Sequence, residues 1–298
     1  MNMLTNVRIN DLRLSWRDYY NLCKARVVAV LLLTAVVGMF LATPEVPDLL
    51  LILVATLGIG LCASSAAAFN HVLDRRFDAV MYRTRNRPLP SGKVGTQQAI
   101  LFASIIGALG FSTLYLFVNP LSAYLTLASL IGYALIYTAF LKRATPQNIT
   151  IGGLAGAMPP LLGWVSITGT LDPNSLLLVL IIFAWTPPHF WALAIHKRED
   201  YAKAGIPMLP VTHGVAFTQL QILLYTCLLI ITTALPFITA MSGLIYLFGV
   251  VLLNIRFMYF AIQLFGNDES VPLRMFWYSI RYIMWLFAWL LLDHYLPL

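Results

Sequence analysis

Long apolar runs recur along almost the whole chain, and they restrict its fold more than any other feature. Each run has about 18 to 23 residues, enough to cross roughly 30 Å of hydrocarbon as a helix. Hydrophobic residues make up 60% of the 298 residues and charged residues only 10%, which is more apolar surface than one water-soluble core can bury. The pattern predicts an all-α, polytopic membrane protein.

About nine membrane spans are predicted within a single domain, residues 1–298. The chain shows no obvious repeat, Ser-rich linker or low-complexity tail. Its first residues are polar and lack a small-residue cleavage site, so no cleaved signal peptide is expected. The predicted spans are 25–43, 49–69, 96–117, 120–141, 148–168, 175–195, 218–238, 241–263 and 275–295.

Positive residues are confined to one side of these spans. All 19 Lys and Arg fall in loops or span ends on one face, whereas the opposite loops "TPEVPD", "VNP" and "GTLDPN" contain none. Short loops rich in Lys and Arg stay in the cytoplasm, so the amino terminus is expected inside and the carboxyl terminus outside. The net charge of +7 therefore indicates orientation and anionic substrates, not nucleic acid.

A row of polar residues follows the second predicted span. If the helix continues, Asn70, Asp74 and Asp78 lie on one face, with a rise of about 6 Å per step. Two carboxylates one turn apart suit Mg²⁺, which completes its shell with water and phosphate oxygens. Because unpaired acids are costly near hydrocarbon, this polar row is predicted to be a catalytic site, with Asp74 and Asp78 as the metal ligands.

Five arginines lie in or just after the polar row. Guanidinium groups bind phosphate through two parallel hydrogen bonds, so the cluster suits a diphosphate. A positive-inside signal explains some of them equally well, and Arg75, Arg76 and Arg85 are left open on this point. The remaining two are Arg83 and Arg87.

A second cytoplasmic segment, residues 186–214, concentrates further polar residues. His189 and His196 lie seven residues apart, about two helical turns and on one face, and Lys197 and Asp200 follow. Two adjacent prolines before His189 are expected to break or kink the sixth span. This segment can face the polar row across one cavity; interfacial histidines with local hydrogen bonds are the alternative.

The segment "NHVLDRRFDAVMYRTRNRPLPSG" resembles the Asn-x-x-x-Asp-x-x-x-Asp motif of the UbiA-type intramembrane prenyltransferases. Within it "RTxxRPL", and later "DYAKAGIPMLPV", are similar to the protoheme IX farnesyltransferase branch. The resemblance covers nearly the whole chain, including "GGLAGAMPPLLGW" and "WTPPHFWALAI". It implies a bacterial cytoplasmic (inner) membrane protein whose helices surround a central chamber open to the cytoplasm.

The resemblance also implies the reaction. Mg²⁺ and arginines would stabilise the diphosphate that leaves farnesyl diphosphate, so that the allylic carbon–oxygen bond ionises. The vinyl group of heme B would attack the cation, and water would capture the resulting porphyrin-side cation to give heme O. The implied partners are both substrates and the lipid bilayer. Handover of the product to heme A synthase or terminal oxidase assembly is left open.

The family's site residues carry over onto matching positions. Asn70, Asp74 and Asp78 take the diphosphate–Mg²⁺ positions, Arg83 and Arg87 the basic positions, and Asp200 the end of the second acidic motif. The resemblance therefore implies that Asp200 is catalytic together with Asn70, Asp74 and Asp78. Most superfamily members have two aspartates where this chain has His189 and His196, which favours the heme branch. The predicted substrate-binding residues are therefore Arg83, Arg87, Lys197, His189 and His196.

Another departure from the family lies at the start of the first span. The family pattern there is Lys-Pro, whereas this chain has Lys24 followed by Ala25. Lys24 is therefore not included in the predicted site.

Two other functions remain as alternatives. Prenyl transfer to an aromatic acid such as 4-hydroxybenzoate would use the same diphosphate site with a different acceptor pocket. A secondary transporter would also have many spans, but its polar residues should lie at mid-span in repeated segments. Here they gather at one membrane face.

Overall fold

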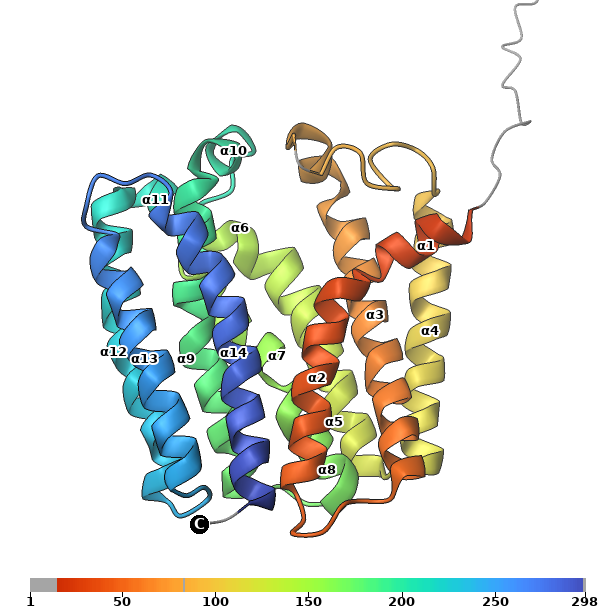
Figure 1. Ribbon diagram of the computed structural model, residues 1–298. Coiled ribbons are helices and arrows are strands. Elements are labelled where there is room, and N and C mark those ends of the chain that lie inside the picture. Colours follow the sequence, from red (N-terminus) through yellow and green to blue (C-terminus); the bar gives the residue numbers. More distant parts are fainter. Residues whose placement is uncertain (1–14, 83, 297–298) are drawn as a thin grey trace, which may run out of the picture.

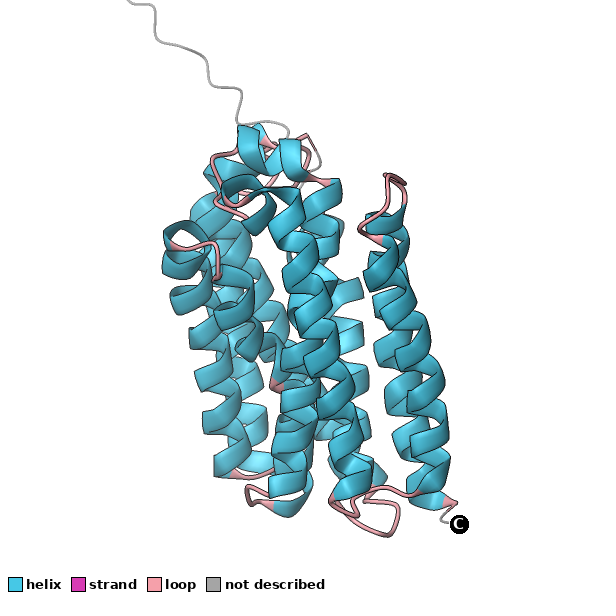
Figure 2. Ribbon diagram, turned by 90° about the vertical axis from the view of Figure 1, so that its left-hand side faces the viewer, coloured by secondary structure: helices cyan, strands magenta, loops and turns pink. Residues whose placement is uncertain are grey.

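The computed structural model describes residues 15–82 and 84–296, and within these ranges it contains helices and no strand. Figure 1 shows the long helices running side by side between two ends of the molecule. Figure 2, from the side, shows the loops gathered at those two ends. This arrangement is that of a polytopic membrane protein, as the apolar runs predict.

The helices follow one another along the chain with short connections. In Figure 1, α9, α12, α13 and α14 form one side of the bundle and α2 to α5 the other, with α7 and α8 between them. The bounds are α1 Trp16–Leu22, α2 Ala25–Leu41, α3 Leu49–Val80, α4 Thr96–Phe117, α5 Pro120–Ile131, the π-helix η1 Gly132–Leu141, α6 Lys142–Ala144, α7 Asn148–Ala157, α8 Pro159–Thr168, α9 Pro173–His196, α10 Arg198–Lys203, α11 Leu209–Thr212, α12 Gly214–Ile238, α13 Leu244–Gln263 and α14 Val271–Tyr295.

Eight spans in the described residues are long and apolar enough to cross a membrane, and a ninth is obtained if α1 and α2 are counted as one bent span. These two helices meet at 53°. Lys24, between them, has a φ of 49°, the left-handed conformation that ends α1 and redirects the chain. The prediction of about nine spans is confirmed, but the first one is bent.

Helix α3 extends well beyond the predicted span end at residue 69. It continues to Val80 as one helix, so Asn70, Asp74 and Asp78 are helical residues. Asp48 caps its start by accepting a hydrogen bond from the Leu50 amide at 2.9 Å. The alignment of these three residues on one face required the helix to continue past residue 69, and it does.

Prolines act differently in two spans. Helix α9 continues through Pro187 and Pro188, so the predicted break does not occur. Membrane helices tolerate proline when neighbouring helices enclose it, and α9 packs against α7, α12 and α14. The predicted span 148–168 instead divides at Met158, where α8 begins with Pro159 in its first turn.

The span 120–141 contains a π-helix that the apolar pattern does not predict. From Gly132 to Leu141 the backbone has the wider π-helical winding. Within it, the Thr138 hydroxyl donates to the Tyr133 carbonyl at 2.9 Å. π-Helical segments are rare and frequently lie at functional sites.

The segments that carry Lys and Arg lie at the same end of the bundle. The end of α3, α6 and α10 all lie at the upper end in Figure 1, whereas α14 ends below. Arg8 and Arg13 lie outside the described residues. The connections at the opposite end contain no Lys or Arg; they are residues 42–48, 118–119, 169–172 and 239–243.

Two glycines let α2 and α8 approach closely. A Cβ atom at Gly163 would lie 1.9 Å from the Ala35 carbonyl oxygen, and one at Gly38 would lie 2.2 Å from that of Pro160. Backbone on both sides leaves no side chain that can move aside. Small residues at such contacts are typical of helix packing in membranes.

We therefore expect Gly163→Ala to destabilise the protein by about 1–3 kcal/mol through overpacking. Gly156→Ala in α7 is the matched control, because its added Cβ would meet no atom within 4 Å. Thermal denaturation of the detergent-solubilised proteins measures the difference. Equal midpoints for the two variants would contradict the close α2–α8 contact.

Candidate active site

The polar row is buried near the carboxyl-terminal end of α3, the end that is predicted to face the cytoplasm. Only 3% of Asn70, 2% of Asp74 and 4% of Asp78 is exposed. The Asn70 amide nitrogen donates to Asp74 Oδ2 at 3.0 Å, as the four-residue spacing permits. Two carboxylates therefore lie on one helix face with almost no access to solvent.

Each member of the polar row contacts a cation from a different part of the chain. Lys24 Nζ, from the α1–α2 bend, donates to Asn70 Oδ1. Lys142 Nζ, directly after η1, lies 2.5 Å from Asp74 Oδ2. Arg87, in the loop after α3, donates from Nη1 to Asp78 Oδ1 at 3.0 Å and Oδ2 at 2.8 Å. Buried carboxylates require such partners.

Lys24 and Lys142 are absent from the sequence-based set of site residues. From the sequence, Lys142 and its neighbour Arg143 are interpreted only as positive charges that orient the membrane spans. The contacts join residues 46 and 68 positions apart, so no local spacing links either lysine to the row. For Lys142 the only sequence signal is its position beside an apolar span, which fits an ordinary span end equally well. Lys24 also matches the lysine of the Lys-Pro pattern, but the proline that follows it there is missing here.

The π-helix supplies a further contact. Asn70 Nδ2 also donates to Thr138 Oγ1 at 3.1 Å. The rings of Tyr133 and Tyr137 lie 5.5 Å apart on the same segment. Gly152 of α7 allows this arrangement, because a Cβ there would lie 2.0 Å from the Tyr137 ring. The segment therefore brings Thr138 and Lys142 to the polar row together.

The donor atoms of the row fit a divalent cation completed by substrate. Asp74 Oδ1 is buried and has no hydrogen-bond partner, so one carboxylate oxygen is available. Across residues 15–82 and 84–296, no three His, Cys, Asp or Glu side chains form a full ligand set. Mg²⁺ needs none, because it takes one or two carboxylates and accepts phosphate oxygens for the rest.

His71 adds a buried imidazole beside the row. Its Nδ1 lies 3.9 Å from Asp78 Oδ2, and neither ring nitrogen has a hydrogen-bond partner. The spacing of seven residues puts His71 and Asp78 on the same face of α3. The imidazole therefore belongs to the same buried face as the carboxylates.

The other arginines of the cluster lie elsewhere. Arg83 is outside the described residues. Arg85 stacks over the Tyr82 ring at 4.7 Å, and both side chains are exposed. Arg75 donates from Nη1 to the Val72 carbonyl at 2.9 Å. Neither of these two contacts reaches the polar row.

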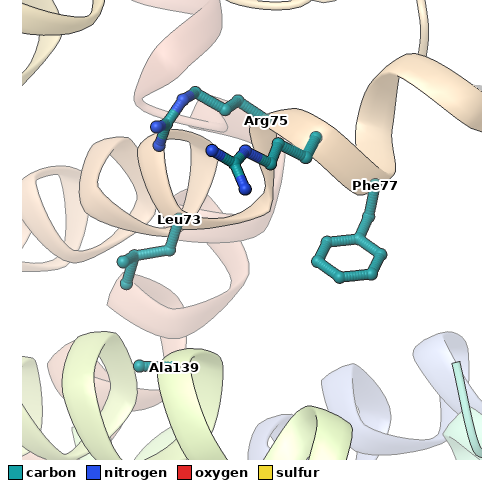
Figure 3. A pocket seen from close by; sticks show the side chains of 5 residues that line it. Leu73, Arg75, Phe77 and Ala139 are labelled. Atoms are coloured by element: carbon teal, nitrogen blue, oxygen red, sulfur yellow. The ribbon is translucent and has the colours of Figure 1, made fainter.

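A cavity of about 250 Å³ lies on the neighbouring face of α3 (Figure 3). Consecutive helical residues point about 100° apart, so its lining by Leu73 and Phe77 differs from the face of Asp74 and Asp78. The cavity is therefore adjacent to the polar row and separate from it. It is also lined by Arg75, Arg76 and Ala139.

His189 is buried within an aromatic group on α9 and α14. Its ring stacks on Trp185 at 4.3 Å and on Phe276 at 4.6 Å, and its Nδ1 lies 2.6 Å from Ser279 Oγ. Trp185 Nε1 donates to the Ser279 carbonyl at 2.9 Å. These contacts hold the imidazole in one orientation.

The other predicted residues of this segment are more open. His196 ends α9 and is exposed, while Lys197 and Asp200 are half-buried. Within the described ranges, no hydrogen bond or ion pair joins these three residues to the polar row. Figure 1 shows α10 and the end of α3 at the same end of the bundle but apart. Their meeting across one cavity stays a prediction.

Comparison with known proteins shows the family to which the chain belongs. Residues 31–291 match the UbiA prenyltransferase family. The chain is 59% identical over 283 residues to a protoheme IX farnesyltransferase of Marinobacter nauticus, covering 95% of this chain and 94% of that protein. It is 58% identical over 285 residues to the one from Legionella pneumophila strain Paris, covering 95% and 97%.

Solved structures share the fold at low sequence identity. A digeranylgeranylglyceryl phosphate synthase structure superposes with a TM-score of 0.78 at 19% identity, covering 94% of this chain and 98% of the other. A UbiA homologue from Archaeoglobus fulgidus bound to DMAPP and Mg²⁺ gives 0.66 at 18% identity, covering 92% and 99%. These likenesses establish the fold of the chain.

The Arg87–Asp78 pair generates a stability prediction. Arg87→Met leaves a carboxylate in a side chain that is only 6% exposed, so we expect a loss of about 2 kcal/mol. Asp78→Asn in addition should restore part of that stability, since it removes the unpaired charge. Denaturation of both single variants and the double variant measures the coupling. Strictly additive losses would show that the two side chains do not interact.

Proposed function

The chain belongs to the UbiA prenyltransferase family, and we propose that it transfers the farnesyl group of farnesyl diphosphate to the vinyl group of heme B, giving heme O. The observation that carries this proposal is the buried, cation-paired carboxylate row in a chain that aligns over 95% of its length with protoheme IX farnesyltransferases. The row supports diphosphate chemistry, and the relatives support the choice of acceptor.

The diphosphate half of the reaction uses the polar row. Asp74 and Asp78 would hold Mg²⁺, with Asn70 as a neutral neighbour. The bound cation would stabilise negative charge on the departing diphosphate. Arg87 lies at the rim of the row with 29% of its side chain exposed, so it can donate to diphosphate oxygens while contacting Asp78. We propose the same role for Arg83.

The acceptor half needs no protein nucleophile. The allylic carbon–oxygen bond breaks, and the terminal vinyl carbon of heme B bonds to the farnesyl carbon. The oxygen of one water molecule then bonds to the other vinyl carbon, and a proton is released. The protein positions two apolar substrates and excludes other water until the cation has reacted.

The second cytoplasmic segment is proposed to bind the acceptor. His189 sits between aromatic rings that match the planar, apolar character of a porphyrin. His196, Lys197 and Asp200 lie at the cytoplasmic end of the same helix or directly after it, where charged groups of the substrates would meet water. Asp200, which stands where the second acidic motif ends, would contribute to binding the diphosphate and its metal.

The proposed location is the bacterial inner membrane, with the amino terminus in the cytoplasm and the carboxyl terminus in the periplasm. The one-sided distribution of Lys and Arg supports this orientation. Both substrates would then react at the cytoplasmic end of the bundle. Handover of heme O to heme A synthase or to terminal oxidase assembly is a further proposal.

The metal–diphosphate role is tested by Asp74→Asn, which keeps size and helix position but removes a carboxylate ligand. We expect heme O formation from heme B, farnesyl diphosphate and Mg²⁺ to fall by about 10² or more, roughly 3 kcal/mol of transition-state stabilisation. Asp268→Asn is the matched control, since Asp268 is an exposed acid. Full activity of Asp74→Asn, or full activity with a chelator, would overturn the metal–diphosphate role.

The same assay separates the alternative acceptors. Membranes containing the protein are supplied with farnesyl diphosphate and either heme B or 4-hydroxybenzoate, and the products are resolved by chromatography. We expect a more hydrophobic heme and no prenylated acid. A prenylated acid would favour the aromatic-acid alternative, and the absence of any diphosphate-dependent product would favour a transporter.

Orientation is tested with reporter fusions. A reporter joined after Leu298 should be active only if it functions in the periplasm, and one inserted near Gly92 should behave as cytoplasmic, because loops with so strong a positive bias rarely invert. Measuring both fusions in one strain provides the internal control. The reverse pattern would overturn the proposed topology.

A further inference from the structure

We propose that Arg256, Arg274 and Arg281 form a binding site for the headgroup phosphate of an anionic phospholipid, on the outer face of α13 and α14. All three of these residues, the α13–α14 arginines, are exposed. The inference goes beyond the proposed reaction and does not depend on it, because it requires only that the bundle crosses a membrane. In the proposed orientation the lipid belongs to the cytoplasmic leaflet.

Two of the α13–α14 arginines lie well inside their helices. Arg256 stands seven residues before the end of α13 at Gln263, and Arg281 stands ten residues after the start of α14 at Val271. At about 1.5 Å per residue they lie roughly 10 Å and 15 Å from those helix ends, at the depth of hydrocarbon. The positive-inside rule concerns charges in the loops, so it gives no reason for arginine at this depth.

The three side chains gather around two aromatic rings. Arg256 lies over the rings of Tyr278 and Phe260, with its Cζ 5.5 Å and 5.9 Å from their centroids. Arg274 Cζ lies 5.7 Å from the centroid of the same Phe260 ring. Arg274 and Arg281 stand four residues before and three residues after Tyr278, so they share its side of α14. One face of two neighbouring helices therefore carries three guanidinium groups (Figure 1).

An acidic side chain balances only one of the three charges. Arg274 Nη1 lies 3.3 Å from Asp268 Oδ2. Within residues 15–82 and 84–296, neither Arg256 nor Arg281 makes an ion pair or donates a hydrogen bond. Cation–π contact offsets only part of the cost of a charge in hydrocarbon, because an aromatic ring carries no net charge. The two remaining charges call for an anion that the membrane itself supplies.

A phospholipid headgroup has the matching chemistry. Its phosphate accepts two parallel hydrogen bonds from a guanidinium group, and basic pockets between membrane helices on the cytoplasmic side are typical sites for anionic lipids. Trp277 and Trp285 stand one turn to either side of Arg281 and are 56% and 60% exposed. Amphipathic rings therefore flank the charges where the glycerol and the upper acyl chains would pack.

The α13–α14 arginines face away from the segment that is proposed to bind the acceptor. On α14, Phe276 and Ser279 contact His189. Arg274 precedes Phe276 by two residues, and Arg281 follows Ser279 by the same interval. Two residues correspond to about 200° of helix rotation, which puts the arginines on nearly the opposite side of α14. An acceptor bound beside His189 would not reach them, so the geometry favours lipid over substrate as the occupant.

The experiment uses the purified full-length protein in detergent and measures lipid binding by native mass spectrometry. Dioleoyl phosphatidylglycerol and dioleoyl phosphatidylcholine share their acyl chains and differ in net charge, so the ratio of their affinities reports recognition of the anionic headgroup. We expect the unmodified protein to bind phosphatidylglycerol about tenfold more tightly. The double variant Arg256→Gln, Arg281→Gln should lose most of this preference. The control Arg198→Gln, Lys203→Gln, which removes two exposed charges from α10, should keep it.

A single variant covers the case in which the double variant does not fold. In the described part of the chain Arg281 makes no ring contact like that of Arg256, so Arg281→Gln removes no packing interaction. It should lower the affinity for phosphatidylglycerol about threefold or more.

Three results would overturn the lipid site. They are equal affinities of the unmodified protein for the two lipids, unchanged phosphatidylglycerol affinity in the folded variants, and displacement of the lipid by an equal concentration of inorganic phosphate or of farnesyl thiodiphosphate with Mg²⁺. The last result would identify a site for free anions or for substrate. Because no arm measures heme O formation, failure of the proposed reaction would leave these outcomes unaffected.

Discussion

Two carboxylates buried at the end of a membrane helix are the constraint on which the rest of this structure depends. Asp74 and Asp78 are each less than 5% exposed, in surroundings that stabilise an isolated charge poorly. Lys142 and Arg87 lie within hydrogen-bonding distance and offset the cost of burying these two carboxylates. Several helices must therefore end at the same place, and this requirement accounts for much of the irregular backbone nearby.

Three backbone features bring these groups together. Helix α3 Leu49–Val80 continues past the apolar run and carries the polar row on one face. The left-handed Lys24 bends the first span, and the π-helix η1 directs Thr138 and Lys142 toward the same point. The bend and the π-helix therefore supply Lys24, Lys142 and Thr138, whereas Arg87 comes from the loop after α3. The close glycine contacts between α2 and α8 show the same dependence on backbone approach deeper in the bundle.

The site as we propose it would combine a polar end with an apolar body, which suits a reaction between a charged leaving group and two hydrophobic substrates. Charge concentrates on the polar row, while His189 lies among aromatic rings on α9 and α14. A reactive allylic cation needs both parts, since the leaving group requires charge and the cation requires protection from water.

Local pattern by itself determined the helical class, the number of spans and the face on which the polar row lies. Apolar run length follows from membrane thickness, and a spacing of four residues follows from helix geometry, so both can be read along the chain. Prolines were less informative: Pro187 and Pro188 do not break α9, which packs against α7, α12 and α14. Only the tertiary structure placed Lys24 and Lys142 on the row, since each contact joins residues 46 or more positions apart. It also separated the buried His189 from the exposed His196, which share a helix face in the sequence pattern but lie at different depths in the bundle.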